Sequence, residues 1–179
     1  MASLRKASSY SKKKARPYTR KAKVQKKSYI KVIPHNKIVK YNMGNLQAYN
    51  AGKYKYELRL LSAERSQIRD NALESCRQLV NKTLDKKLPG RYYFEVRIFP
   101  HHLLRNNKTA AGAGADRLST GMSHSFGVVE GRAAMVPPGK DVFLVSLENE
   151  ADVKAAREAL NMVKAKLPCR TKLNFQKLK

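Results

Sequence analysis

The sequence predicts an α+β fold in which two helices pack against a mostly antiparallel sheet. Two stretches repeat apolar residues at helical spacing, and several others alternate polar and apolar residues as strands do. In order they give short strands, a strand, a helix, a strand, a long loop, two strands, a helix and a strand. With 179 residues and 42% hydrophobic content, the chain is long enough to bury a core. We therefore expect one domain at 29–179, preceded by a basic arm at 1–28.

The arm is extreme in charge, because residues 1–56 contain 16 Lys and Arg residues and no Asp or Glu. Residues 1–27 also hold almost no large apolar side chain, so this segment cannot fold by burying its own surface. Tyr10, Tyr18 and Tyr29 lie among the cations. Aromatic rings between Lys and Arg let a chain stack on bases while it neutralises phosphates. The pattern therefore favours a segment that binds a polyanion over a solvated tail.

The first elements of the domain alternate apolar stretches with turn residues. Residues 29–41 give two short strands or extended edges around a turn at 34–36. Glycine and asparagine then mark a loop at 44–52. The next stretch, 53–61, alternates strictly and places Tyr54, Tyr56, Leu58 and Leu60 on one face. We predict a strand there, with a mostly cationic outer face.

The first helix is predicted to begin after Ser62, a suitable N-cap, and to end by Pro89 and Gly90. Its apolar stripe, which we expect to face the core, consists of Ile68, Ala72, Cys76, Leu79, Val80 and Thr83. A strand follows at 92–98 and stops at Pro100. Another apolar strand is predicted at 142–147, after Gly139.

The second helix follows Asn149, carries Glu150 and Asp152 in its first turn, and ends at Pro168. Its stripe is Val153, Ala156, Leu160, Val163 and Leu167. A final strand is predicted at 171–175. Cys76 is interpreted as a small core residue, and neither it nor Cys169 has the spacing of a metal or redox motif.

The segment between the strand at 92–98 and the strand at 142–147 is the most informative part of the chain. Residues 105–127 show neither helical nor strand periodicity. Gly112 and Gly114 are flanked by alanines, which leaves the backbone N–H groups open to another surface. Arg105, Lys108 and Arg117 face only Asp116 as an acid. Bare backbone and positive charge together suit contact with phosphate, although a solvent loop with ordinary cations has the same composition.

The net charge of the chain indicates which class of molecule it binds. The chain has 38 Lys and Arg residues against 13 Asp and Glu residues, a net charge of +25. Such a chain repels itself unless a polyanion neutralises it, and nucleic acid is the obvious polyanion. An acidic membrane is the weaker candidate, because no long apolar or basic amphipathic stretch is present. With no apolar signal core at its N-terminus, we expect the chain to be cytoplasmic.

Catalysis is the least favoured reading. The side chains that a catalytic site would use are His101, His102, Asp116, Ser119 and His124. Their spacing matches no nucleophile elbow, zinc motif or Walker motif, and GAGADR has Arg117 where a dinucleotide fingerprint needs its third glycine. His101 and His102 are interpreted as polar groups at a sheet edge or as partners of RNA phosphate. We expect no catalytic residue, cofactor or metal.

These segments resemble a known family. PHHLLRNNKTAAGAGADRLSTGM at 100–122, FG at 126–127 and GRAAMV at 131–136 are similar to the central signature of one large-subunit ribosomal protein family. That family is called L-sixteen in bacteria and L-ten-e in archaea and eukaryotes. RPYTR at 16–20, YIKVIPHNKI at 29–38 and MGN at 43–45 resemble the N-terminal region of its archaeal form, and LPCRTKL at 167–173 resembles its C-terminal end.

The resemblance implies a single α+β domain of the hammerhead type, held among helices of large-subunit rRNA together with neighbouring ribosomal proteins, one copy per subunit. It places the protein between the central protuberance and the stalk base, beside the aminoacyl-tRNA site. Residues 105–127 would form a loop that projects toward the peptidyl-transferase region and helps to position tRNA. Two departures stand out: KAKVQKKS at 21–28 is extra basic sequence, and Cys169 replaces the glycine usual after proline.

The residues predicted to contact RNA are Arg5, Lys12, Lys13, Lys14, Arg16, Tyr18, Arg20, Lys21, Tyr29, His101, His102, Arg105, Asn106, Lys108, Gly112, Gly114 and Arg117. Phosphate contacts of this kind position a protein and read no sequence. The alternative function is a basic nucleic-acid-binding or RNA-chaperone protein outside the ribosome. An RNA-processing enzyme is the third reading.

Overall fold

The computed structural model describes residues 32–106 and 128–178, and it confirms an α+β fold. The strands are β1 (Asn42–Gly44), β2 (Tyr56–Ser62), β3 (Ser66–Arg69), β4 (Tyr92–Val96), β5 (His102–Asn106), β6 (Val128–Val136), β7 (Asp141–Leu147) and β8 (Thr171–Lys177). The helices are α3 (Leu46–Asn50), α4 (Asp70–Lys87) and α5 (Glu150–Val163), and the 3-10 turn η2 (Lys164–Lys166) follows α5.

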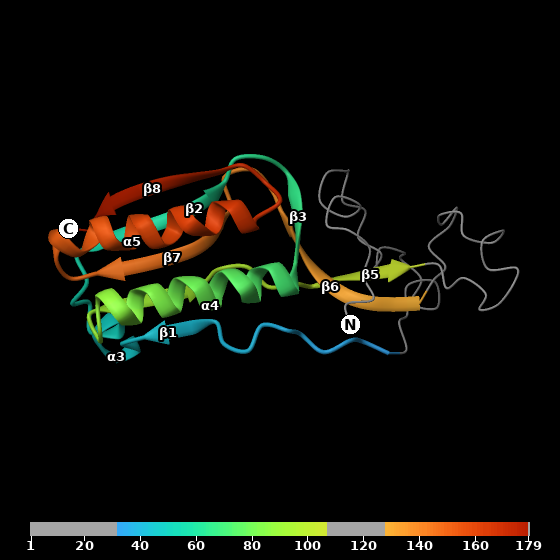
Figure 1. The fold of residues 1–179 in the computed structure, drawn as a ribbon, viewed down its shortest axis with the longest axis horizontal. Coiled ribbons are helices and arrows are strands. Elements are labelled where there is room, and N and C mark those ends of the chain that lie inside the picture. The colour runs from blue at the N-terminus through green and yellow to red at the C-terminus, as the bar shows by residue number, and fades with distance from the viewer. Residues whose placement is uncertain (1–31, 107–127, 179) are drawn as a thin grey trace, which may run out of the picture.

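The larger sheet has five strands in the order β1-β4-β7-β2-β8, and its described pairs are antiparallel. Helices α4 and α5 lie side by side across one face of it (Figure 1). The hydrophobic core lies between the two helices and the sheet. Leu58 and Leu60 of β2 are buried there, and Phe94 of β4 packs on Phe143 of β7 with ring centroids 5.7 Å apart. The alternation at 53–61 thus correctly identified the buried face of β2 at these two leucines.

The smaller sheet has three strands in the order β3-β6-β5 and extends past the ends of the two long helices (Figure 1). Its central strand is β6, which pairs with β3 along residues 133–136 and with β5 along residues 128–133. A turn at Gly139, where φ is +78°, then leads the chain from β6 back into the larger sheet as β7. Two strands of this smaller sheet, β5 and β6, therefore carry the described residues on either side of 107–127.

The start of the first helix differs from the sequence prediction. Ser62 ends β2 and is buried, and its hydroxyl donates to the carbonyl oxygen of Glu64 at 2.7 Å, so it is not the N-cap. Ile68 lies on β3, and α4 begins at Asp70. The buried stripe of α4 contains Cys76 and Val80 as predicted, but Leu73 and Leu84 complete it in place of Ile68 and Thr83. Pairing of β3 with the distant β6 is the reason, because it holds Ser66–Arg69 extended.

The prediction for residues 32–52 was also partly wrong. The described residues before β1 form no strand, and Asn42–Gly44 pairs instead with β4. Within the predicted loop at 44–52, α3 forms because the Asn45 side chain accepts a hydrogen bond from the Ala48 N–H at 3.0 Å. Tyr49 of this helix stacks on Tyr93, with centroids 4.1 Å apart, and covers part of the sheet face away from α4 and α5.

Of the predicted elements, the second helix agrees most closely with the structure, where it is α5. It begins after Asn149, and Val153, Ala156, Leu160 and Val163 are buried as expected. The final strand was predicted at 171–175 and runs two residues further. Cys76 and Cys169 are both buried free thiols. Among the described residues, no helix is long and apolar enough to cross a membrane.

Candidate nucleic-acid interface

Three described chain ends meet at one end of the molecule. Asn106 at the end of β5 pairs with Val128 at the start of β6. The segment before β1 runs back to the same end (Figure 1). There the Arg132 Nε donates to the Pro34 carbonyl oxygen at 2.7 Å. We call this the distal end, defined by residues 32–36, 105–106 and 128–132. It lies beyond the reach of α4 and α5.

The distal end is where two cation-rich segments join the described domain. Residues 1–31 contain 12 Lys and Arg residues and no acid, and residues 107–127 contain Lys108 and Arg117 against Asp116. Both segments lie outside the described residues. The same is true of most predicted RNA contacts, namely Arg5, Lys12, Lys13, Lys14, Arg16, Tyr18, Arg20, Lys21, Tyr29, Lys108, Gly112, Gly114 and Arg117. Their assignment to RNA binding stays a prediction.

The four remaining predicted residues lie on or beside β5. His101 is exposed, Arg105 is partly exposed, and Asn106 is the last residue of the strand. His102 is only 2% exposed, so its side chain is part of the interior in this structure and we remove it from the contact set. The reason is that a separate strand, β5, begins at His102 and pairs with β6, and His102, Leu103 and Leu104 are all buried at its start. Neighbouring His101 and His102 therefore do not form a joint site.

An aromatic stack lies where β4 leads into β5. The ring of Phe99 stacks on that of Tyr41, with centroids 5.6 Å apart and planes at 22°. His101 packs against Phe99 with a centroid distance of 4.5 Å. The Asn36 amide donates to the Tyr41 hydroxyl at 2.6 Å, and burial raises the pKa of Tyr41. Phe99 is nevertheless 41% exposed, so the stack lies at the surface of the domain.

Sequence reasoning missed this stack. A usable signal existed, since the alternation that buries Phe94, Val96 and Ile98 puts Phe99 on the other side of the chain. No comparable signal pointed to Tyr41, which reaches Phe99 from a segment 58 positions earlier.

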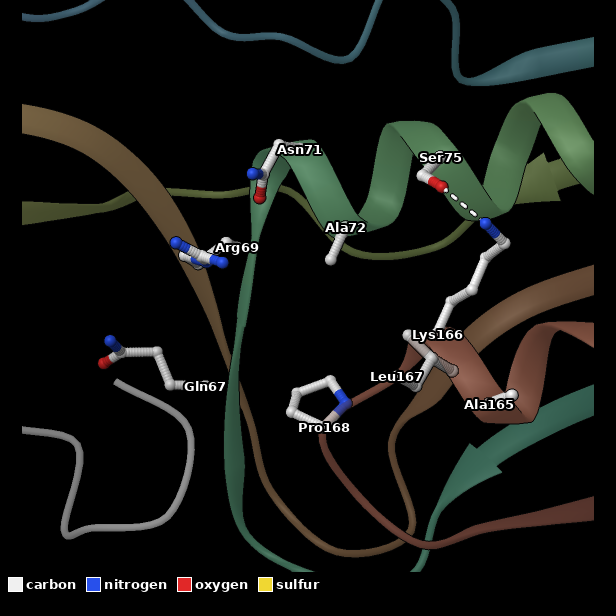
Figure 2. Close-up of a pocket in the computed structure, with 9 residues that line it drawn as sticks. All are labelled: Gln67, Arg69, Asn71, Ala72, Ser75, Ala165, Lys166, Leu167 and Pro168. Atoms are coloured by element: carbon white, nitrogen blue, oxygen red, sulfur yellow. Dashed lines mark hydrogen bonds between the residues drawn. The ribbon is translucent and has the colours of Figure 1, made fainter. Parts of the chain in front are cut away.

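A second feature is an open hollow of about 460 Å³ between the start of α4 and the turn after α5 (Figure 2). It is lined by Gln67, Arg69, Asn71, Ala72, Ser75, Ala165, Lys166, Leu167 and Pro168. The Lys166 Nζ donates to the Ser75 Oγ at 3.2 Å across it. Two of these lining residues are cations and none is an acid, so the hollow suits an anionic group such as phosphate.

The hollow could not be predicted from local sequence, because Ser75 and Lys166 are 91 positions apart.

A metal site requires several ligating side chains close together. Within 32–106 and 128–178, no three His, Cys, Asp or Glu side chains lie close enough together to hold a metal ion.

Comparison with known proteins gives a consistent result. The family model described as "Ribosomal protein L16p/L10e" matches residues 13–174. A "Large ribosomal subunit protein uL16" of Staphylothermus marinus is 42% identical over 177 residues, which is 98% of this chain and 95% of that protein. Proteins of the same name from Sulfolobus acidocaldarius and Methanococcus maripaludis are 44% and 41% identical, and cover 86% and 95% of this chain and 86% and 92% of their own length.

Proposed function

Since this chain belongs to the ribosomal protein L16p/L10e family, we propose that it is a structural constituent of the large ribosomal subunit that binds large-subunit rRNA. We further propose that residues 105–127 help to position tRNA near the aminoacyl-tRNA site and the peptidyl-transferase region. The observation that carries the proposal is the match over residues 13–174, which includes residues 13–31 of the first cation-rich segment, all of residues 107–127 and nearly all of the folded domain.

The proposed mechanism is electrostatic. Lys and Arg of residues 1–31 neutralise rRNA phosphates and release the counterions that the RNA had condensed. A segment with no acids and little apolar surface gains its order from that contact and not from a core of its own. The folded domain then supplies the specificity, because rRNA is recognised largely by shape.

The distal end supports this division of labour. The described chain leads into residues 1–31 and into residues 107–127 from neighbouring positions, linked by the Arg132–Pro34 hydrogen bond. One RNA surface can therefore engage both segments. The hollow at Arg69 and Lys166 offers a further place for a phosphate of the same RNA.

The family consists of ribosomal proteins, which are structural constituents and not enzymes. We accordingly propose no reaction and no cofactor. The partners are rRNA, tRNA and neighbouring ribosomal proteins, with one copy of this chain in each large subunit of the cytoplasmic ribosome.

The test compares two charge-matched variants of the full chain binding to a large-subunit rRNA transcript. The arm variant changes Lys12, Lys13, Lys14 and Arg16 to Gln. The control variant changes four exposed cations on the outer faces of α4 and α5, namely Lys82, Lys86, Lys154 and Arg157. Affinity is measured over a series of salt concentrations, because each phosphate contact adds about 0.7–0.9 to the slope of log affinity against log salt.

We expect the arm variant to lower that slope by about 3 and the control variant to lower it by less than 1. Equal slopes for the two variants would show that binding follows overall charge alone. That result would favour the alternative, a basic nucleic-acid-binding or RNA-chaperone protein.

A further inference from the structure

We propose that the aromatic stack of Tyr41, Phe99 and His101 receives an unpaired base of the large-subunit rRNA. The inference rests on the proposed function and deepens it, because it names a base, in addition to phosphates, as a ligand of the folded domain. It concerns described residues only and is independent of residues 1–31 and 107–127.

The Phe99 ring is stacked on Tyr41 and is also partly exposed to solvent. Tyr41 is fixed beneath Phe99 by the Asn36 hydrogen bond, and its ring lies at 22° to the Phe99 ring. Phe99 in turn contacts His101, and both of these rings are exposed. Bases that proteins hold in single strands stack on Phe, Tyr and His rings presented in this way.

The groups around the stack favour a base over an apolar protein segment. Lys37 and Lys40 are exposed on the segment that precedes β1 and carries Tyr41, and the Arg132 guanidinium acts electrostatically on the Tyr41 hydroxyl. These cations suit the phosphates on either side of a stacked base.

Two acids also face Tyr41, but each already has partners. Asp70 accepts hydrogen bonds from the N–H groups of Lys37 and Asn71. Glu74 pairs with Arg77 at 2.6 Å and accepts from the Val39 N–H. The imidazole of His101 adds a polar edge that can bond to a base.

A second exposed ring provides the matched control. Phe175 on β8 is 42% exposed, against 41% for Phe99, and it also stacks on a tyrosine, Tyr56, at 6.1 Å. It lies on the edge strand of the larger sheet, away from the distal end (Figure 1). A general effect of removing an exposed aromatic ring will therefore appear equally in Phe175→Leu and Phe99→Leu.

The experiment uses purified large subunits without tRNA, carrying the wild-type chain, Phe99→Leu, Phe99→Tyr or Phe175→Leu. Dimethyl sulfate and a carbodiimide probe the exposed edges of unpaired rRNA bases. Ultraviolet cross-linking of the wild-type subunits, followed by mass spectrometry, identifies what Phe99 and His101 touch. Protein content per subunit is measured first, so that loss of incorporation, which bears on the proposed function, is separated from loss of stacking.

We expect at least one rRNA base to become three-fold or more reactive in Phe99→Leu, to return to wild-type reactivity in Phe99→Tyr, and to be unchanged in Phe175→Leu. The cross-link should join Phe99 or His101 to a nucleotide of rRNA. Normal incorporation with unchanged base reactivity in Phe99→Leu would overturn the inference and leave the proposed function intact. A cross-link from Phe99 and His101 to a protein side chain in place of rRNA would also overturn it.

Discussion

Arg132 and Pro34 are 98 positions apart, yet the Arg132 Nε donates to the Pro34 carbonyl oxygen at 2.7 Å. This bond ties the segment that precedes β1 to the central strand of the smaller sheet. It fixes the place from which the chain continues into its basic N-terminal residues, beside the strand ends that lead into residues 107–127. A side-chain contact within the folded domain thus holds together the described residues next to which the two cation-rich segments begin.

Changing Arg132 to Leu should loosen residues 32–41 without unfolding the domain. A hydrogen bond from a charged group is worth about 1.5 kcal/mol, and its loss corresponds to about a tenfold faster local opening. Hydrogen exchange of peptides covering 32–41 measures this. Peptides from α5 serve as the internal control and should exchange at the wild-type rate. Unchanged exchange at 32–41 would contradict the role given to this contact.

Gly44 should tolerate no side chain. Its φ is +84°, and an added Cβ would overlap the carbonyl oxygen of Tyr92 on the neighbouring strand. Gly44→Ala should therefore cost about 3 kcal/mol or more of unfolding free energy, measured by urea denaturation. Gly139 also has positive φ, +78°, but an added Cβ meets nothing within 4 Å, so Gly139→Ala should cost only about 1–2 kcal/mol. Equal losses would disprove the steric argument.

Alkaline pH should destabilise the protein through Cys76. Burial raises the pKa of its thiol to about 12, whereas an unfolded cysteine loses its proton near pH 8.5. Between these values the unfolded state binds fewer protons than the folded state, so the free energy of unfolding falls as pH rises. The fall due to this thiol approaches about 1.4 kcal/mol per pH unit.

The matched variant for this effect is Cys76→Ala. It should be less stable than wild type at pH 7, because it removes a buried sulfur, but its stability should fall less steeply between pH 9 and pH 10. The two curves therefore converge as pH rises. Burial raises the pKa of Tyr93 to about 12 as well, but a tyrosine adds to the fall only above about pH 10. Parallel curves for the two proteins would refute the assignment to Cys76.

Arg105 and Arg117 are expected to act on tRNA. Ribosomes carrying both Arg105→Ala and Arg117→Ala should accommodate aminoacyl-tRNA about a hundredfold more slowly, since each change removes a charge-assisted contact worth about tenfold. Lys82→Ala, on the exposed face of α4, is the control and should leave the rate unchanged. The measurement uses ribosomes with a normal protein content. Wild-type rates in the double variant would mean that this segment does not position tRNA.

Elements with local start and stop signals were predictable from the sequence. Helix α5 is the clearest case, because Asn149 precedes it, acids occupy its first turn and Pro168 follows its last turn. Its buried stripe was correct at every residue from Val153 to Val163 that the prediction named. The face of β2 that carries Leu58 and Leu60 followed equally from strict alternation.

Elements created by distant pairing were not predictable in this way. Ser66–Arg69 continues a helix-like apolar spacing, and only its pairing with Ala133–Val136 keeps it extended. The strand His102–Asn106 likewise depends on β6, and the inward direction of His102 follows from it. For the site, the sequence located the basic arm at 1–28 and the cationic loop at 105–127, but not the aromatic stack or the hollow. Those arise where Tyr41 meets Phe99 and where Ser75 meets Lys166, through contacts that no local pattern encodes.

Sucrose-gradient fractionation of a cell lysate, with this chain followed through washes of rising salt, tests the central claim most directly. A structural constituent of the large subunit should stay in the large-subunit peak at about one copy per particle, because contacts of its basic segments and its folded domain with rRNA keep it bound to the subunit. A chain that washes into free fractions at moderate salt, or that spreads across DNA and RNA, would contradict the ribosomal role. The inference from the net positive charge, that the chain binds nucleic acid, would still hold, and the function would be that of a free nucleic-acid-binding protein.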